Sequence, residues 1–87
     1  MKNKELALIF NKMGDALELK GESIFKVSAY HKSAKTLESL TEDIEKIWKE
    51  DRLQTLPGVG KGIAKKIDEY LRTGKIKKYE EIISKTP

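Results

Sequence analysis

The fold of this chain is decided by the stretch Leu56-Pro57-Gly58-Val59-Gly60-Lys61-Gly62-Ile63-Ala64-Lys65-Lys66-Ile67. Its first half predicts a tight turn, because Gly58 and Gly60 permit positive φ and the close approach of another molecule. Its second half predicts a basic amphipathic helix, and the free N–H groups at the start of such a helix form an anion site. A phosphate is the natural occupant of that site, and Lys61, Lys65 and Lys66 add positive charge. The stretch therefore indicates a module that binds a nucleic-acid backbone.

The composition is that of one small folded domain. Charged residues make up 37% of the chain and apolar residues 38%, and the net charge of +4 favours a polyanionic partner. The absence of cysteine excludes disulfides and thiolate metal sites. No apolar run approaches the roughly 18 residues of a membrane-spanning helix, so we expect no membrane partner.

Apolar residues recur at steps of three and four throughout, which predicts an all-α fold. We expect helices at about 2–19, 24–39, 42–50 and 61–73, a short helical turn at about 51–55, and a last short helix carrying Ile76, Tyr79, Ile82 and Ile83. Ser23 and Thr41 are the predicted N-caps of the second and third helices, and Gly74 is predicted to end the fourth. The pattern predicts a small helical bundle containing a helix-hairpin-helix unit, as one domain over residues 1–87.

A helical projection of residues 61–73 separates the lysines of the basic helix. Lys61 and Lys65 fall near the solvated side, whereas Lys66 falls beside the apolar stripe, about 40° from Tyr70. Two interpretations of Lys66 stay open. Either its aliphatic stem covers the edge of the core, or partial burial favours the neutral amine and makes it a nucleophile toward carbonyl carbon.

The second helix carries further candidate residues. Tyr30 lies at the centre of its apolar stripe, where it is either a core residue or part of a site, and Lys26 lies one turn earlier at the edge. Phe25 projects to the far side, where it either staples the start of the helix or offers an aromatic face to a base. His31, the only histidine, is expected at the surface.

A second basic patch follows Gly74 and consists of Lys75, Lys77 and Lys78. Solvation and contact with a nucleic-acid backbone are both open interpretations of this patch. The acidic residues mostly lie elsewhere, which predicts separate basic and acidic faces. The chain has no Asp-X-Asp pair for two magnesium ions, no cysteine nucleophile and no Walker-type phosphate loop, so we expect none of the chemistry that these motifs carry.

Several motifs then point to one family. They are Leu56-Pro57-Gly58-Val59-Gly60, Ile63-Ala64-X-Lys66-Ile67-Asp68-Glu69, Thr73-Gly74-Lys75, Lys26 with Ala29-Tyr30-X-Lys32, and Leu17-Glu18-Leu19-Lys20-Gly21-Glu22. Together they resemble the amino-terminal domain of family X DNA polymerases, in particular the bacterial and archaeal branch. The resemblance covers nearly the whole chain. It implies that this domain is the first part of a longer polymerase, acting as a monomer in the cytoplasm at the nucleoid.

The resemblance implies sequence-independent DNA binding at the 5′-phosphate side of gaps or nicks in base excision repair. It also implies a 5′-deoxyribose-phosphate lyase reaction, in which Lys66 forms a Schiff base with C1′ of the sugar and Tyr30 supports the site. Lys26 and Lys78 would contact the 5′-phosphate, and Phe25 would stack on a template base. The further DNA contacts expected are those of Gly58, Gly60, Lys61, Lys65 and Lys75.

The same resemblance implies one ion and two departures from the family pattern. The backbone carbonyls of Gln54, Leu56 and Val59 would bind Na⁺ or K⁺ in the hairpin, and no other cofactor is required. A lysine of the lyase pocket is replaced by Gly62, and an acidic residue before the nucleophile is replaced by Lys65. Both departures concern the lyase reaction rather than DNA binding. The alternative function is a non-catalytic helical module that binds a protein or generic duplex DNA.

Overall fold

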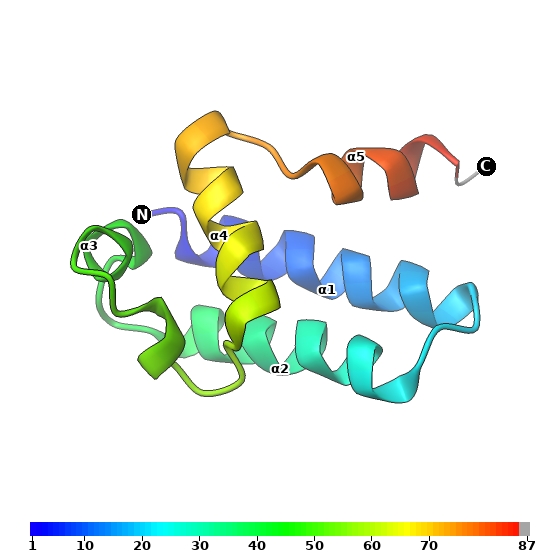
Figure 1. The fold of residues 1–87 in the computed structure, drawn as a ribbon, viewed down its shortest axis with the longest axis horizontal. Coiled ribbons are helices and arrows are strands. Elements are labelled where there is room, and N and C mark those ends of the chain that lie inside the picture. Colours follow the sequence, from blue (N-terminus) through cyan, green and yellow to red (C-terminus); the bar gives the residue numbers. More distant parts are fainter. Residues whose placement is uncertain (86–87) are drawn as a thin grey trace.

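The computed structural model describes residues 1–85, and within them it consists of helices without strands (Figure 1). The helices are α1 (Asn3–Leu19), α2 (Ile24–Ser39), α3 (Ile44–Lys49), the 3₁₀-helix η1 (Leu53–Thr55), α4 (Lys61–Thr73) and α5 (Lys77–Ser84). The all-α prediction is confirmed, and the predicted bounds of α2 and α4 are those observed. No helix of the described residues has both the length and the apolar character needed to cross a membrane.

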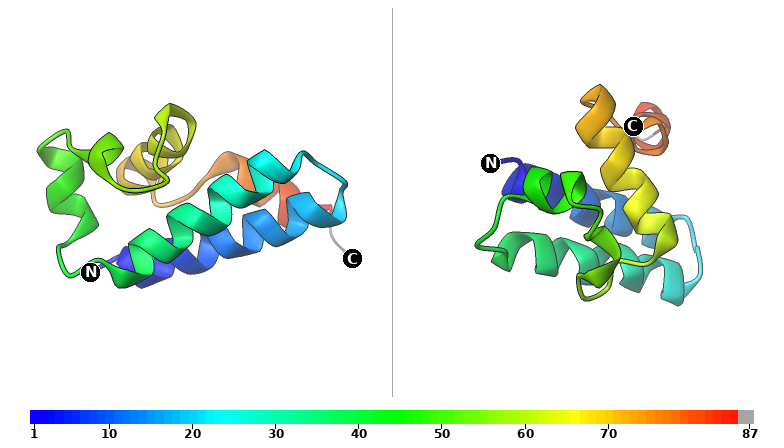
Figure 2. Two further views of the ribbon diagram at one scale, coloured as in Figure 1. Left: turned by 90° about the horizontal axis from the view of Figure 1, so that it is seen from below. Right: turned by 60° about the vertical axis from the view of Figure 1, so that its left-hand side comes forward.

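The antiparallel pair α1 and α2 forms the base of the molecule (Figure 2). The turn between them begins with a Schellman motif, in which the N–H of Glu22 donates to the Leu17 carbonyl and the N–H of Gly21 to the Glu18 carbonyl. Ser23 then caps α2 as predicted, because its hydroxyl accepts from the N–H of Phe25 at 3.2 Å. The buried residues that the pair contributes are Leu6, Ala7, Phe10, Met13, Leu17, Val27, Tyr30, Ala34 and Leu37.

Helix α4 crosses the α1–α2 pair, and α5 then runs alongside α1 (Figures 1 and 2). The side chains of Ile63, Ile67 and Tyr70 on α4 are buried, as the amphipathic pattern predicts. Ile82 of α5 is also buried, whereas Ile83 leaves 46% of its surface exposed. The last short helix is therefore present, and its eight residues bury a narrow stripe centred on Ile82, with Ile83 at the exposed edge.

Helix α3 begins later than the sequence predicts. The predicted cap Thr41 lies exposed in a bend. The observed N-cap is Asp43, whose carboxylate accepts from the N–H of Glu45 at 3.0 Å. The helical turn predicted at 51–55 is likewise shorter, being the three residues of η1.

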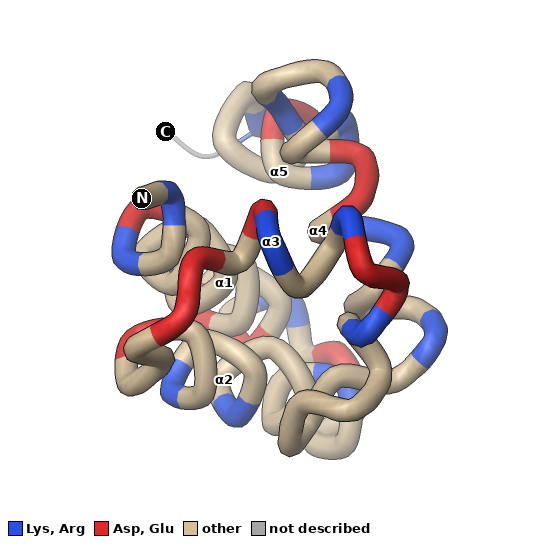
Figure 3. The backbone as a smooth tube through the Cα atoms, turned by 90° about the vertical axis from the view of Figure 1, so that its left-hand side faces the viewer, with Lys and Arg blue, Asp and Glu red and all other residues tan. Residues whose placement is uncertain are grey.

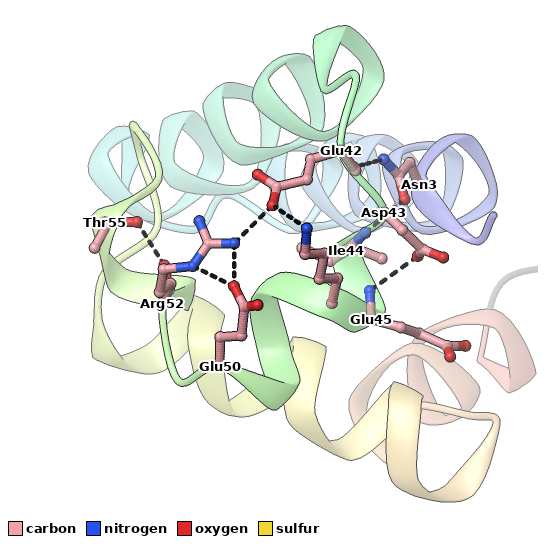
Figure 4. A network of polar contacts seen from close by, with 9 residues as sticks. Asn3, Glu42, Asp43, Ile44, Glu45, Glu50, Arg52 and Thr55 are labelled. Carbon is pink, nitrogen blue, oxygen red and sulfur yellow. Dashed lines mark hydrogen bonds and ion pairs between the residues drawn. The ribbon is translucent and has the colours of Figure 1, made fainter.

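A buried asparagine explains where α3 starts (Figure 4). The side-chain amide of Asn3 donates to the backbone carbonyl of Glu42 at 2.7 Å, and its oxygen accepts from the N–H of Ile44 at 3.0 Å. Asn3 is 2% exposed, so both halves of its amide need these partners. Arg52 closes the other side of this network by bonding Glu42 and Glu50. These contacts hold the backbone extended at Asp43, so α3 begins only at Ile44.

Candidate nucleic-acid interface

The predicted glycine turn is a type II β-turn formed by Leu56, Pro57, Gly58 and Val59. The N–H of Val59 donates to the carbonyl of Leu56 at 3.1 Å. Pro57 occupies the second position, and Gly58 occupies the third with φ of +78°. This conformation favours glycine because a side chain at positive φ is strained. The turn connects η1 to α4 and makes the hairpin.

The hairpin is attached to the C-terminal half of α2. The hydroxyl of Thr36 donates to the carbonyl of Pro57 at 2.7 Å. One turn earlier on α2, the side chain of Lys32 packs against Gly58, and a Cβ at Gly58 would lie 2.9 Å from Lys32 Cγ. The absence of a side chain at Gly58 therefore allows both the positive φ of the turn and the close packing of the turn against α2.

The start of α4 presents unused backbone donors. Its N-cap is Gly60, which has no side chain to accept from the first N–H groups, and no acidic residue lies in the first turn. The free amides and the positive end of the helix dipole therefore remain available to an anion. Lys61 is exposed beside them.

A groove of about 400 Å³ runs between α2 and the hairpin. It brings together six of the ten residues predicted for catalysis or DNA binding, two from α2 and four from the hairpin and α4. Its lining residues are Lys26, Ala29, Tyr30, Gly58, Gly60, Gly62, Ile63, Lys65 and Lys66. No carboxylate or imidazole is among them, so within the described residues the groove offers cations, amides and one phenol.

The other predicted residues do not line this groove. Lys61 borders a neighbouring hollow of about 430 Å³ that also contains Trp48. Lys75 lines a second groove, of about 560 Å³, which shares Lys65 and Lys66 with the first. Lys78 lies half-buried on α5. The predicted contacts therefore form an extended surface along both sides of α4 rather than one pocket.

Phe25 is 84% exposed at the start of α2. A staple requires an apolar contact that closes the helix end. At this exposure Phe25 makes no such closure, so the staple interpretation was wrong. The ring is left available for stacking.

Tyr30 is both a core residue and a groove residue. Its ring packs edge-on against Phe10 with centroids 5.7 Å apart, and only 6% of its surface is exposed. Burial raises the pKa of Tyr30 above 10.0. The phenol therefore keeps its proton at neutral pH, where it can donate a hydrogen bond but cannot act as a base.

The projection of α4 is confirmed by exposure. Lys61 and Lys65 are exposed, whereas Lys66 is half-buried at the edge of the groove. Among residues 1–85 no acidic side chain forms an ion pair with any of these three lysines, so their charges are available to phosphates.

The separation of acidic and basic faces is only partial. Acidic residues gather in the segment that leads into α3 (Figure 3). However, Asp68 lies on α4 itself, where Arg72 bonds to it at 2.8 Å. The bond from Arg72, followed by the one from the indole of Trp48, lowers the pKa of Asp68. Arg72 is therefore neutralised within the protein, unlike the lysines of the groove.

Thr36 and Ala29 are site residues that the sequence reasoning missed. Ala29 lines the groove beside Tyr30, and Thr36 holds the hairpin against α2. Ala29 stands in the family motif Ala29-Tyr30-X-Lys32, but for Thr36 the available signal was spacing, because residues 29, 32 and 36 recur at helical steps on one side of α2. That spacing does not reveal which distant segment packs there.

Comparison with known proteins agrees with this architecture. The family model described as "Helix-hairpin-helix domain" matches residues 1–76, and the chain belongs to this family. Over all 87 residues the chain is 33% identical to DNA polymerase/3'-5' exonuclease PolX of Bacillus subtilis (strain 168), and it spans 15% of that protein's length. This likeness confirms the resemblance to family X DNA polymerases that the motifs indicated.

Proposed function

We propose that this chain binds DNA, independently of base sequence, at the 5′-phosphate side of gaps or nicks. The observation that carries the proposal is the groove that joins the hairpin glycines to Lys26 and Lys66. Membership of the helix-hairpin-helix family supports DNA as the partner. In this proposal the chain is the amino-terminal domain of a family X DNA polymerase that acts in base excision repair, at the nucleoid.

Each part of the surface has a distinct role in the proposed complex. The hairpin amides and Lys61 hold the duplex backbone, and Lys26 holds the terminal 5′-phosphate. Lys78, which the resemblance also assigned to this phosphate, does not line the groove. The exposed ring of Phe25 stacks on an unpaired template base. Lys75 and Lys78 extend the contact with the backbone beyond α4. Such contacts reach phosphates and a base face but not base edges, so they carry no sequence information.

The test is binding of gapped DNA with and without a 5′-phosphate, measured by fluorescence anisotropy. We expect tighter binding of the phosphorylated DNA, and we expect Lys26→Ala to remove most of this preference. Lys12→Ala is the matched control, because Lys12 is exposed on α1 and lines neither groove. Equal affinity for the two DNAs would favour a generic duplex-binding module. No binding of either DNA would favour a protein-interaction module.

The salt dependence tests the electrostatic part of the same proposal. Four phosphate contacts on duplex DNA give a slope of log K against log salt of about −3.6. Lys61→Ala should reduce the magnitude of the slope by about 0.9. A slope near zero would contradict backbone binding.

A 5′-deoxyribose-phosphate lyase activity is a second proposed function, favoured by the half-buried position of Lys66 in the groove beside Tyr30. The Lys66 amine would attack C1′ of the ring-opened sugar, and loss of water would give the Schiff base. Removal of a C2′ proton would then break the C3′–O bond and leave a 5′-phosphate on the DNA. The groove holds no carboxylate or imidazole to take that proton, and Tyr30 stays protonated, so we expect slow elimination with solvent as the base.

Borohydride trapping on incised abasic DNA tests the lyase. We expect a covalent adduct whose yield falls to background in Lys66→Ala, while Lys65→Ala keeps it. Either no adduct in the parent chain or a full yield in Lys66→Ala would refute the role of Lys66. The binding proposal survives both outcomes.

The hairpin carbonyls form a proposed site for Na⁺ or K⁺. Within residues 1–85 the carbonyl of Leu56 accepts only from Val59 in the turn, and a carbonyl oxygen has a second lone pair. The carbonyl of Gln54 lies in the last turn of η1, where a helix leaves its carbonyls without intrahelical donors. Together with the Val59 carbonyl, these oxygens are hard donors of the kind that a monovalent cation would take in the proposed site. Replacing KCl by tetramethylammonium chloride at equal ionic strength should weaken DNA binding if the ion bridges the hairpin to a phosphate.

A further inference from the structure

Three side chains that can bind a metal ion meet on the α1–α2 pair, and none of them lines the groove. Asp15 and Glu18 lie one turn apart on α1, and His31 faces them from α2. His31 Nε2 lies 3.3 Å from Asp15 Oδ1. One ligand atom from each of the three residues lies within 4.8 Å of the others. The side chain of His31 is 36% exposed, so it lies at the surface as predicted, with its ring against α1.

The orientation of the His31 ring is fixed by α1. Its Nδ1 lies 2.9 Å from the side-chain oxygen of Asn11, and because that oxygen accepts, the two atoms form a hydrogen bond in the tautomer with the proton on Nδ1. The ring also lies directly on the α1 backbone at Gly14, where a Cβ would come within 2.7 Å of Nε2. In the neutral ring, Nε2 therefore directs its lone pair toward the two carboxylates.

A positive charge among these three acceptors is favourable. A proton on Nε2 joins His31 to one carboxylate oxygen and leaves the other carboxylate to solvent, to which both Asp15 and Glu18 are exposed. A metal ion satisfies all three. In addition, two ligands bound about 2.0–2.1 Å from a tetrahedral ion lie about 3.3 Å apart, which is the observed separation between His31 Nε2 and Asp15 Oδ1.

We propose that Asp15, Glu18 and His31 bind a divalent transition-metal ion of the Zn²⁺ class, with solvent completing its coordination. An imidazole nitrogen with two carboxylates suits zinc better than magnesium or calcium, which prefer oxygen ligands alone. Bonding of Asn11 to the other ring nitrogen is the arrangement that metal-binding histidines usually show. Such an ion would join α1 to α2 beside their connecting turn and stabilise the pair, because it binds the folded chain alone.

Calorimetric titration of the untagged chain with zinc chloride tests the proposal. We expect one Zn²⁺ per chain and a melting temperature that rises with zinc concentration. The chain has a single histidine and no cysteine, so no other imidazole or thiolate site competes. Asp15→Asn and Glu18→Gln should each weaken binding by about tenfold or more. Glu38→Gln, which removes an exposed carboxylate from α2, is the matched control and should bind as the parent chain does.

A second pair of variants separates metal binding from a simple surface ion pair. Asn11→Ala removes the acceptor for Nδ1 and should weaken zinc binding by roughly tenfold. Asn11→Asp keeps an acceptor at the same place and should retain it. The proposal is overturned if zinc binding does not saturate, if Mg²⁺ binds as tightly as Zn²⁺, or if Glu38→Gln costs as much affinity as Asp15→Asn.

Discussion

The hydroxyl of Thr36 donates to the carbonyl of Pro57 at 2.7 Å, and this bond joins the last turn of α2 to the tip of the hairpin. The two residues are 21 positions apart in the chain. The bond fixes the position of Gly58, which lines the groove together with Lys26 and Tyr30 of α2. The relative placement of the two halves of the proposed DNA site therefore depends on a contact that lies outside the groove.

Thr36→Val removes this donor and keeps the shape of the side chain. We expect the free energy of unfolding in urea to fall by about 1 kcal/mol, and the affinity for gapped DNA to fall as the hairpin loosens. Ser39→Ala is the control, because the Ser39 hydroxyl bonds only to carbonyls of its own helix. If both variants bind DNA equally well, the bond does not position the hairpin.

Gly58→Ala should destabilise the chain by about 1–2 kcal/mol, the cost of a left-handed conformation for a residue with a Cβ. Contact with Lys32 adds to this cost, since the new Cβ would lie 2.9 Å from Lys32 Cγ. Adding Lys32→Ala to the Gly58→Ala chain should recover the stability lost through contact with Lys32. It should not recover the stability lost through the left-handed backbone conformation. Urea unfolding of the single and double variants measures both, and full recovery would show that the positive φ is not strained.

Gly62→Lys should strengthen binding of 5′-phosphorylated gapped DNA. Gly62 lines the groove near the start of α4, and a Cβ there would meet nothing within 4 Å. The added lysine therefore fits without repacking and brings one more charge to the phosphate. Gly62→Ala is the control, since it adds a Cβ without charge and should leave DNA affinity unchanged. An equal gain in both variants would mean that helix stabilisation, not charge, is responsible.

Ionisation of the Tyr70 phenol should lower the stability of the folded chain at high pH. Burial, followed by the hydrogen bond that its hydroxyl donates to Glu5, raises the pKa of Tyr70 from 10.0 to about 12. Because the folded value is the higher one, the stabilisation is complete below about pH 10 and is lost as the pH rises to about 12. Tyr70→Phe has no phenol to ionise, so its unfolding free energy should decline less over this range. Identical declines in urea unfolding experiments would contradict the prediction.

Protonation of Asp68 should destabilise the folded chain at low pH. The fluorescence of Trp48, the only tryptophan, can report this change. The Oδ1 atom of Asp68 accepts from the indole N–H of Trp48 at 2.8 Å, and Arg72 bonds to Oδ2. The pKa of Asp68 is lowered from 3.8 in the folded chain, so its stabilisation is present above about 3.8 and is lost as the pH falls through the lowered value. We expect Trp48 fluorescence to titrate in that range, and Asp68→Asn to abolish the transition. Persistence of the transition in Asp68→Asn would assign it to another carboxyl.

Local sequence signals predicted some features well because their physical causes are local. The 3.6-residue period located α2 and α4, and Ser23 was recognisable as a cap from its position alone. The same period correctly separated exposed Lys65 from half-buried Lys66. By contrast, both Thr41 and Asp43 are good capping residues, and the choice between them depends on bonds from Asn3 at the far end of the chain.

The sequence by itself determined the helices, the glycine hairpin and the excess of positive charge around α4, since helix period and turn chemistry act between near neighbours. Only the tertiary structure decided that Lys26 and Tyr30 share a groove with Gly58 and Lys66. It also placed His31 against the carboxylates of α1. These juxtapositions arise from the packing of helices far apart in the chain, and packing depends on the fit of whole surfaces that no local pattern records.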